Sequence, residues 1–100
     1  MKFGLEEKVI DTVNECLSNY LEIEEVIIYG SRAKGNYRNG SDIDLTLKGD
    51  SLTLSTILKL ENEIDDLLLP YKFDLSIYHQ IDNQDLIDHI ERVGKIFYTK

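Results

Sequence analysis

Residues 30–45 read GSRAKGNYRNGSDIDL, and this stretch decides how the rest of the chain is interpreted. A glycine and a serine open it, directly after the run 26–29, whose β-branched and aromatic residues are typical of a buried strand. It closes on a strict alternation in which Asp42 and Asp44 face one side and apolar residues face the other. The stretch is therefore expected to join two strands through a glycine-rich turn.

Apolar periodicity outside this stretch predicts three amphipathic helices and two more strands. The expected elements are a helix over 5–20, strands over 26–29 and 42–48, a helix from Ser51 to Pro70, a strand over 72–78, a helix from Asp82 to Gly94, and a short edge strand over 95–99. Ser51 and Asp82 are the expected N-caps, and Pro70 and Gly94 the expected stops. This order predicts a small sheet with helices packed against it, an α/β or α+β fold.

Length and composition limit the classes of protein that this chain can belong to. The 100 residues are expected to form a single domain, 1–100, with 42% hydrophobic residues to build its core. One cysteine, Cys16, and the absence of a long apolar run predict a soluble cytoplasmic protein that does not enter membranes. The net charge of -8 argues against DNA or long RNA as a partner and favours a basic protein surface.

Three acidic residues are the candidates for chemistry. Asp42 and Asp44 stand two positions apart on one strand, which places their Cα atoms roughly 6–7 Å apart on one face. Asp74 faces the polar side of the strand over 72–78, and it reaches the same site if the two strands are neighbours. Such a group of carboxylates suits magnesium, and three of them suit two ions. The alternative is that these residues merely occupy the solvent side of half-exposed strands.

The turn at the start of the quoted stretch is the candidate anion site. Gly30 allows the backbone to approach a ligand closely, and Ser31 offers a hydroxyl and N–H groups. Arg32 and Lys34 add positive charge for a triphosphate. The alternative is an ordinary strand-to-turn connection with two solvated basic side chains.

The spacing of these elements resembles the nucleotidyltransferase motif of the DNA polymerase β-like superfamily. Gly30-Ser31 precedes Asp42-x-Asp44 by ten residues, and Asp74, in KFDLSIY, stands where that family has its third carboxylate. The closing HIERVGKIFY also resembles the family's last helix and strand, so the likeness covers essentially the whole chain. The short length is similar to that of the minimal nucleotidyltransferase (MNT) branch.

The resemblance implies a mixed sheet in which the glycine–serine turn faces the carboxylates across the triphosphate of ATP. Asp42 and Asp44 would hold Mg²⁺, and Asp74 would complete a second metal site and help to deprotonate the incoming hydroxyl. Ser31 and the backbone at Gly30 would hold the β- and γ-phosphates. The α-phosphate would then be attacked in line, and pyrophosphate would leave.

The MNT resemblance also implies a partner, because such proteins are often encoded beside a HEPN-domain ribonuclease toxin. The implied activity is transfer of AMP to a hydroxyl, a tyrosine, of that toxin, with the chain as its antitoxin. A non-catalytic antitoxin that neutralises by occlusion remains the alternative, and transfer to a small molecule such as an aminoglycoside ranks below both. His79, His89 and Tyr98 receive no role.

Overall fold

The computed structural model describes residues 1–100 and has one four-stranded sheet with helices on both faces. The elements in chain order are α1 (Glu7–Ser18), β1 (Glu25–Tyr29), α2 (Gly30–Lys34), β2 (Ile43–Lys48), α3 (Leu54–Asp66), β3 (Phe73–Ile77), the 3-10 turn η1 (Tyr78–Gln80), α4 (Gln84–Val93) and β4 (Lys95–Thr99). The predicted order of the strands and of the three longer helices is confirmed, whereas residues 30–34, expected as a glycine-rich turn, form the short helix α2, and η1 was not predicted.

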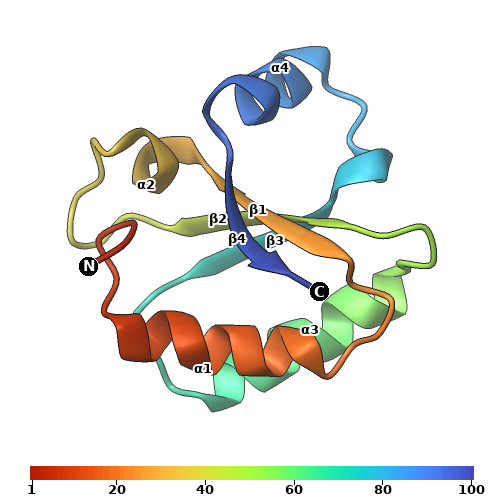
Figure 1. Cartoon of the computed structure of the whole chain (residues 1–100), viewed down its shortest axis with the longest axis horizontal. Helices are drawn as coiled ribbons and strands as arrows, with labels where there is room; N and C mark the ends of the chain where they lie inside the picture. The colour runs from red at the N-terminus through yellow and green to blue at the C-terminus, as the bar shows by residue number, and fades with distance from the viewer.

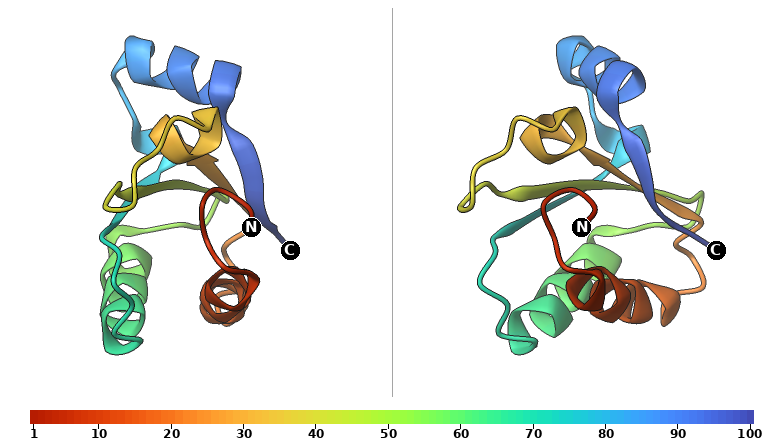
Figure 2. Two further views of the ribbon diagram at one scale, coloured as in Figure 1. Left: turned by 90° about the vertical axis from the view of Figure 1, so that its left-hand side faces the viewer. Right: turned by 60° about the vertical axis from the view of Figure 1, so that its left-hand side comes forward.

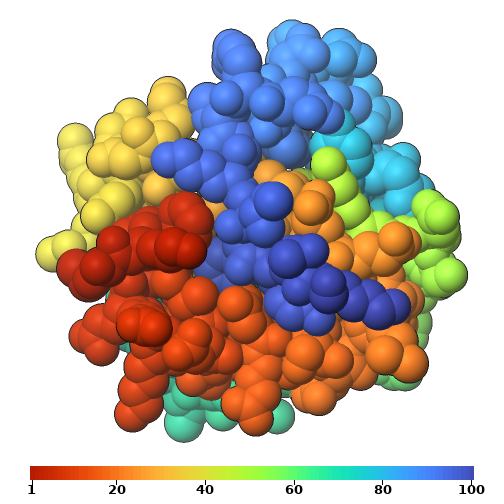
Figure 3. Space-filling model, in the orientation of Figure 1, coloured from red at the N-terminus to blue at the C-terminus, as the bar shows by residue number.

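The strands lie in the order β3-β2-β1-β4. β1 pairs antiparallel with both β2 and β4, whereas β2 and β3 run parallel and are connected through α3. The sheet is therefore mixed, and the predicted edge strand over 95–99 is confirmed at one end of it. β4 also lies at the molecular surface, beside the N-terminal residues (Figure 3).

The two faces of the sheet are covered by different pairs of helices: α1 and α3 lie on one face, and α2 and α4 on the other (Figures 1 and 2). The first face holds the main hydrophobic core, in which strand residues such as Val26, Ile28 and Leu47 pack with residues of α1 and α3. On the second face only a small cluster forms, around Ile27, Tyr29 and Ile90. The alternation along β1 assigns its residues to these two faces.

Several predicted boundaries are wrong by a few residues. α3 begins after Thr53 rather than Ser51, and it ends at Asp66, well before Pro70. Asn83, not Asp82, caps α4, because its Oδ1 accepts a hydrogen bond from the backbone N–H of Leu86 at 3.2 Å. Thr53 occupies the N-cap position of α3 without a side-chain cap hydrogen bond, so Asn83 alone of the two caps its helix through its side chain.

β2 begins at Ile43, so Asp42 lies just outside the strand rather than at its first position. The N–H of Ile43 donates to the carbonyl of Lys72 at 2.8 Å, which starts the pairing of β2 with the segment leading into β3. Asp42 is exposed in the loop that precedes this contact.

Candidate active site

The parallel pairing of β2 and β3 brings two of the three predicted carboxylates together. Asp44 and Asp74 are direct partners in the register, so their Cα atoms are about 4.8 Å apart and their side chains share one face. Asp42 lies two residues before Asp44, at the same end of the strand. The predicted adjacency of Asp74 to Asp44 is confirmed, and it arises because α3 returns the chain to the open side of β2.

The surroundings of Asp44 disfavour its charged form. Burial raises the pKa of its carboxyl, and the negative charges of Asp74 and then Asp42 raise that pKa further. A protonated His89 would act in the opposite direction and lower the pKa of Asp44. A half-buried carboxylate beside two others is therefore disfavoured in its charged form, and a cation would relieve that repulsion.

Gly30 lies directly against Asp44. Its φ of 74° is in the left-handed region, and a Cβ at this position would collide with Oδ2 of Asp44. Tyr29 is the register partner of Asp44 on the neighbouring strand, so the chain leaves β1 immediately above the carboxylate. The sequence here requires glycine for two reasons, the backbone conformation and the space taken by the carboxylate. Ser31 follows, half-buried, as the first side chain after the turn.

His89, which the sequence did not assign, completes this arrangement from α4. Its Nε2 accepts a hydrogen bond from the backbone N–H of Gly30 at 3.1 Å. The imidazole also meets the ring of Tyr29 edge-on, with the ring centroids 6.2 Å apart. Since 59 residues separate His89 from Gly30, no local pattern could have indicated the contact.

Arg32 occupies a different place from the one its predicted role suggests. The side chain is only 2% exposed, and it donates three hydrogen bonds to main-chain carbonyls: Nη1 to Phe3 at 2.8 Å, and Nε and Nη2 to Ser41 at 3.1 and 3.0 Å. The guanidinium carbon also lies 5.4 Å from the ring centroid of Tyr37. Arg32 thus fixes the loop immediately before Asp42. Lys34, by contrast, is exposed.

The carboxylates of Asp42, Asp44 and Asp74, at one end of β2 and β3, are ligands of the type that a magnesium ion prefers. Carboxylate oxygens are its preferred protein ligands, and the ion completes its shell with water and phosphate oxygens. The mutual repulsion around Asp44 is what such an ion would neutralise. The acidic and histidine side chains of the chain form no preformed cluster of three around a common metal position. The triphosphate would therefore have to supply part of the coordination.

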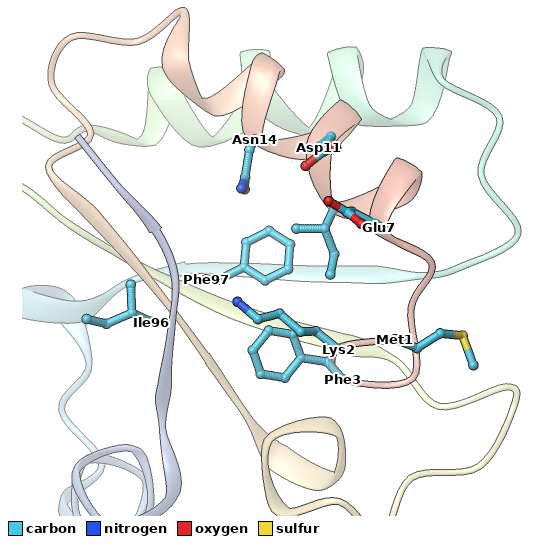
Figure 4. A pocket seen from close by; sticks show the side chains of 9 residues that line it. Met1, Lys2, Phe3, Glu7, Asp11, Asn14, Ile96 and Phe97 are labelled. Atoms are coloured by element: carbon cyan, nitrogen blue, oxygen red, sulfur yellow. The ribbon is translucent and has the colours of Figure 1, made fainter.

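A cavity of about 430 Å³ lies elsewhere, between the N-terminal segment, α1 and β4 (Figure 4). Phe3 and Phe97 line it, together with polar side chains of α1 such as Asn14. It contains none of the residues predicted for the site. Asp44 and Ser31 are half-buried and Asp74 is exposed.

A glycine–serine turn thus lies against paired strand carboxylates on the less packed face of a mixed sheet. Residues 11–100 match the family model described as "Polymerase beta, Nucleotidyltransferase", and the chain belongs to this family. It is a nucleotidyltransferase by family, with the α+β fold that the sequence predicted.

Solved structures give the same fold. A toxin–antitoxin structure with AMP-PNP is 21% identical with a TM-score of 0.71, and the match covers 96% of this chain and 75% of the other. A complex of a tri-AMPylated Shewanella oneidensis HEPN toxin with its MNT antitoxin is 15% identical, with a TM-score of 0.69 and coverage of 96% and 74%. The toxin–antitoxin pair MntA-HepT matches at 15% identity and a TM-score of 0.68, over 95% and 74% of the two chains.

At such identities the likeness establishes the fold alone. No curated protein matches the chain. None of the helices combines the length and the apolar character needed to span a bilayer.

Proposed function

We propose that this nucleotidyltransferase transfers AMP from magnesium-bound ATP to a tyrosine hydroxyl of a HEPN-domain ribonuclease toxin, and that it thereby acts as an antitoxin in the cytoplasm. The observation that carries the proposal is the pairing of Asp44 with Asp74 beneath the turn at Gly30. The toxin–antitoxin structures of the same fold, one with AMP-PNP and one with an AMPylated toxin, support the choice of donor and acceptor.

In this reaction the acceptor oxygen forms a bond to the α-phosphorus, and the bond between that phosphorus and the bridging oxygen of pyrophosphate breaks. Pyrophosphate leaves with the bonding electron pair, and Asp74 assists removal of the hydroxyl proton. Ser31 and the backbone next to it hold the β- and γ-phosphates. Asp42 and Asp44, with Asp74, would hold two Mg²⁺ ions, which when bound neutralise phosphate charge and lower the pKa of the attacking hydroxyl.

Lys34 is the basic side chain best placed to serve the triphosphate, since it is exposed and lies on α2, four residues after Gly30. The phosphate contact predicted for Arg32 stays a prediction. In our proposal Arg32 acts through the loop that it fixes, because its guanidinium is buried and bonded to the carbonyls of Phe3 and Ser41.

The intact mass of the partner tests this proposal. The chain is incubated with the HEPN protein encoded beside it, ATP and Mg²⁺, and the HEPN protein is then weighed by mass spectrometry. We expect its mass to rise by one or more AMP groups, and we expect no rise with Asp44→Asn or without Mg²⁺. A partner that binds the chain but never gains mass would contradict AMP transfer.

The acidic surface favours a second candidate function, neutralisation by occlusion without chemistry. The net charge is -8, and α4 exposes Asp85, Asp88 and Glu91. A basic ribonuclease would be drawn to such a surface. Under this alternative, Asp44→Asn would still protect cells from the toxin. Under AMP transfer it would bind the toxin without protecting.

A further inference from the structure

The contact between His89 and Gly30 joins two elements that are otherwise unrelated in the chain. The first N–H groups of any helix lack partners within the helix, and the N–H of Gly30 is one of these. Here an imidazole nitrogen from α4 accepts it at 3.1 Å. An acceptor nitrogen carries no proton, so in this state His89 is neutral and its proton is on Nδ1.

The hydrogen bond acts on a turn that has little freedom. Gly30 is pressed against Oδ2 of Asp44 in a left-handed conformation. The carboxylate of Asp44 restricts the movement of Gly30 on one side, and His89 accepts the hydrogen bond of the Gly30 N–H on the other. The edge-on contact with Tyr29 and the burial of Ile90, the next residue of α4, keep the imidazole in place.

We propose that His89 is a positioning residue of the active site: it fixes the glycine–serine turn through the N–H of Gly30, so that Ser31 is presented to the triphosphate. This inference rests on the proposed function. The hydrogen bond with His89 also means that the N–H of Gly30 is not available to bind phosphate. The hydroxyl and N–H of Ser31 remain for the ligand.

The substitution His89→Phe separates this role from simple packing, because phenylalanine keeps a ring of similar size but has no hydrogen-bond acceptor. It fills the space under Tyr29 but leaves the N–H of Gly30 without its partner. We expect Mg²⁺–AMP-PNP to bind about 10-fold more weakly, which is a loss of about 1.4 kcal/mol at 25 °C. His89→Gln retains an acceptor oxygen at similar reach and is expected to restore affinity to within about 3-fold of wild type.

The matched control is His79→Ala, which removes an exposed histidine on η1 and is expected to leave affinity unchanged. Affinities are measured by titration calorimetry on chains whose folding is verified by thermal unfolding. Wild-type affinity in His89→Phe, or equal losses in the Phe and Gln variants, would overturn the positioning role.

A second readout does not depend on nucleotide. In the ¹⁵N-labelled wild-type chain, the N–H···N bond should give a scalar coupling between the amide nitrogen of Gly30 and Nε2 of His89. Absence of this coupling overturns the inference even if nucleotide binds. A wild-type chain that shows the coupling but binds no nucleotide retains the contact, and it is then the proposed function that fails.

Discussion

The two faces of the sheet are built for different purposes. The face under α1 and α3 is a continuous apolar core in which residues such as Leu45 and Leu47 are fully buried. The face under α2 and α4 carries Asp44 and Asp74 in register, and next to them the hydroxyls of Thr46 and Ser76, which are buried without a hydrogen-bond partner.

Each of these features of the second face lowers stability. Carboxylates in register repel each other, and a buried polar atom without a partner costs free energy. One face therefore supplies most of the hydrophobic burial, while the other keeps a repulsive arrangement that a bound cation would stabilise. Substitutions on the two faces should therefore have separable effects.

The largest effect is expected from Gly30→Ala, which should damage both properties at once. The new Cβ meets Oδ2 of Asp44, so either the turn or the carboxylate must move. We expect AMP transfer to fall about 100-fold or more, as displacement of a reacting group does, and the unfolding free energy to fall by about 2 kcal/mol. Transfer is followed by partner mass, and stability by urea unfolding.

Gly35→Ala is the matched control for this substitution. Gly35 has a φ of 89°, but a Cβ there meets nothing within 4 Å. Because only backbone strain is added, we expect the unfolding free energy to fall by about 1 kcal/mol and the rate of AMP transfer to stay unchanged. Equal losses of activity in the two variants would show that the contact with Asp44 does not matter.

Leu47→Ala tests the opposite face. Leu47 is fully buried against the main core, so its truncation should lower the unfolding free energy by about 2–5 kcal/mol. The remaining folded molecules should transfer AMP at the wild-type rate, because no residue of the site touches the change. Urea unfolding and the initial rate at low temperature measure the two quantities. A loss of rate per folded molecule would contradict the separation of the two faces.

Arg32→Lys tests the attachment of the loop before Asp42. Lysine cannot reproduce the paired donation of Nε and Nη2 to Ser41, and its ammonium would be buried. We expect the unfolding free energy to fall by about 2 kcal/mol.

The exposed neighbour Lys34 provides the contrast. Lys34→Ala should change stability by less than about 0.5 kcal/mol and should weaken AMP-PNP binding. If Arg32→Lys left stability intact and only weakened nucleotide binding, Arg32 would be a phosphate ligand, as its place in the motif first suggested.

The smallest effect is expected in the pH dependence of the unfolding free energy. Burial, Asp74 and Asp42 raise the pKa of Asp44 above its unfolded value, so between about 3.9 and the raised pKa the folded chain binds the proton more tightly. The contribution of Asp44 to stability therefore falls as the pH rises through this window. Asp44→Asn should be more stable than wild type at pH 7 and equally stable at pH 3. Asp50→Asn, at an exposed position past the far end of β2, should show no such gain.

Much of the site was predictable because alternation along a strand assigns side chains to faces. The facing of Asp44 and Asp74 followed from that rule, and their adjacency needed only the assumption that β2 and β3 are neighbours. The start of β2 was misplaced by one residue, since the pairing of Ile43 with Lys72 sets the boundary and depends on a distant segment.

Two contacts could not be predicted from local sequence. Arg32 reaches Phe3 across 29 residues, and His89 reaches Gly30 across 59. In both cases a side chain binds a main-chain atom, which leaves no complementary residue type to search for. The motif suggested a charged surface role for Arg32, whereas the fold buries the guanidinium and uses it to hold the loop.

Calorimetry decides whether Asp44 holds a metal ion with the nucleotide: the affinity for AMP-PNP is measured with and without Mg²⁺ in wild type and in Asp44→Asn. We predict that Mg²⁺ tightens binding at least about 10-fold in wild type, and that this gain disappears in the folded variant. An equal gain in Asp44→Asn, or a wild-type affinity that ignores Mg²⁺, would contradict a metal-dependent nucleotide site on this face of the sheet.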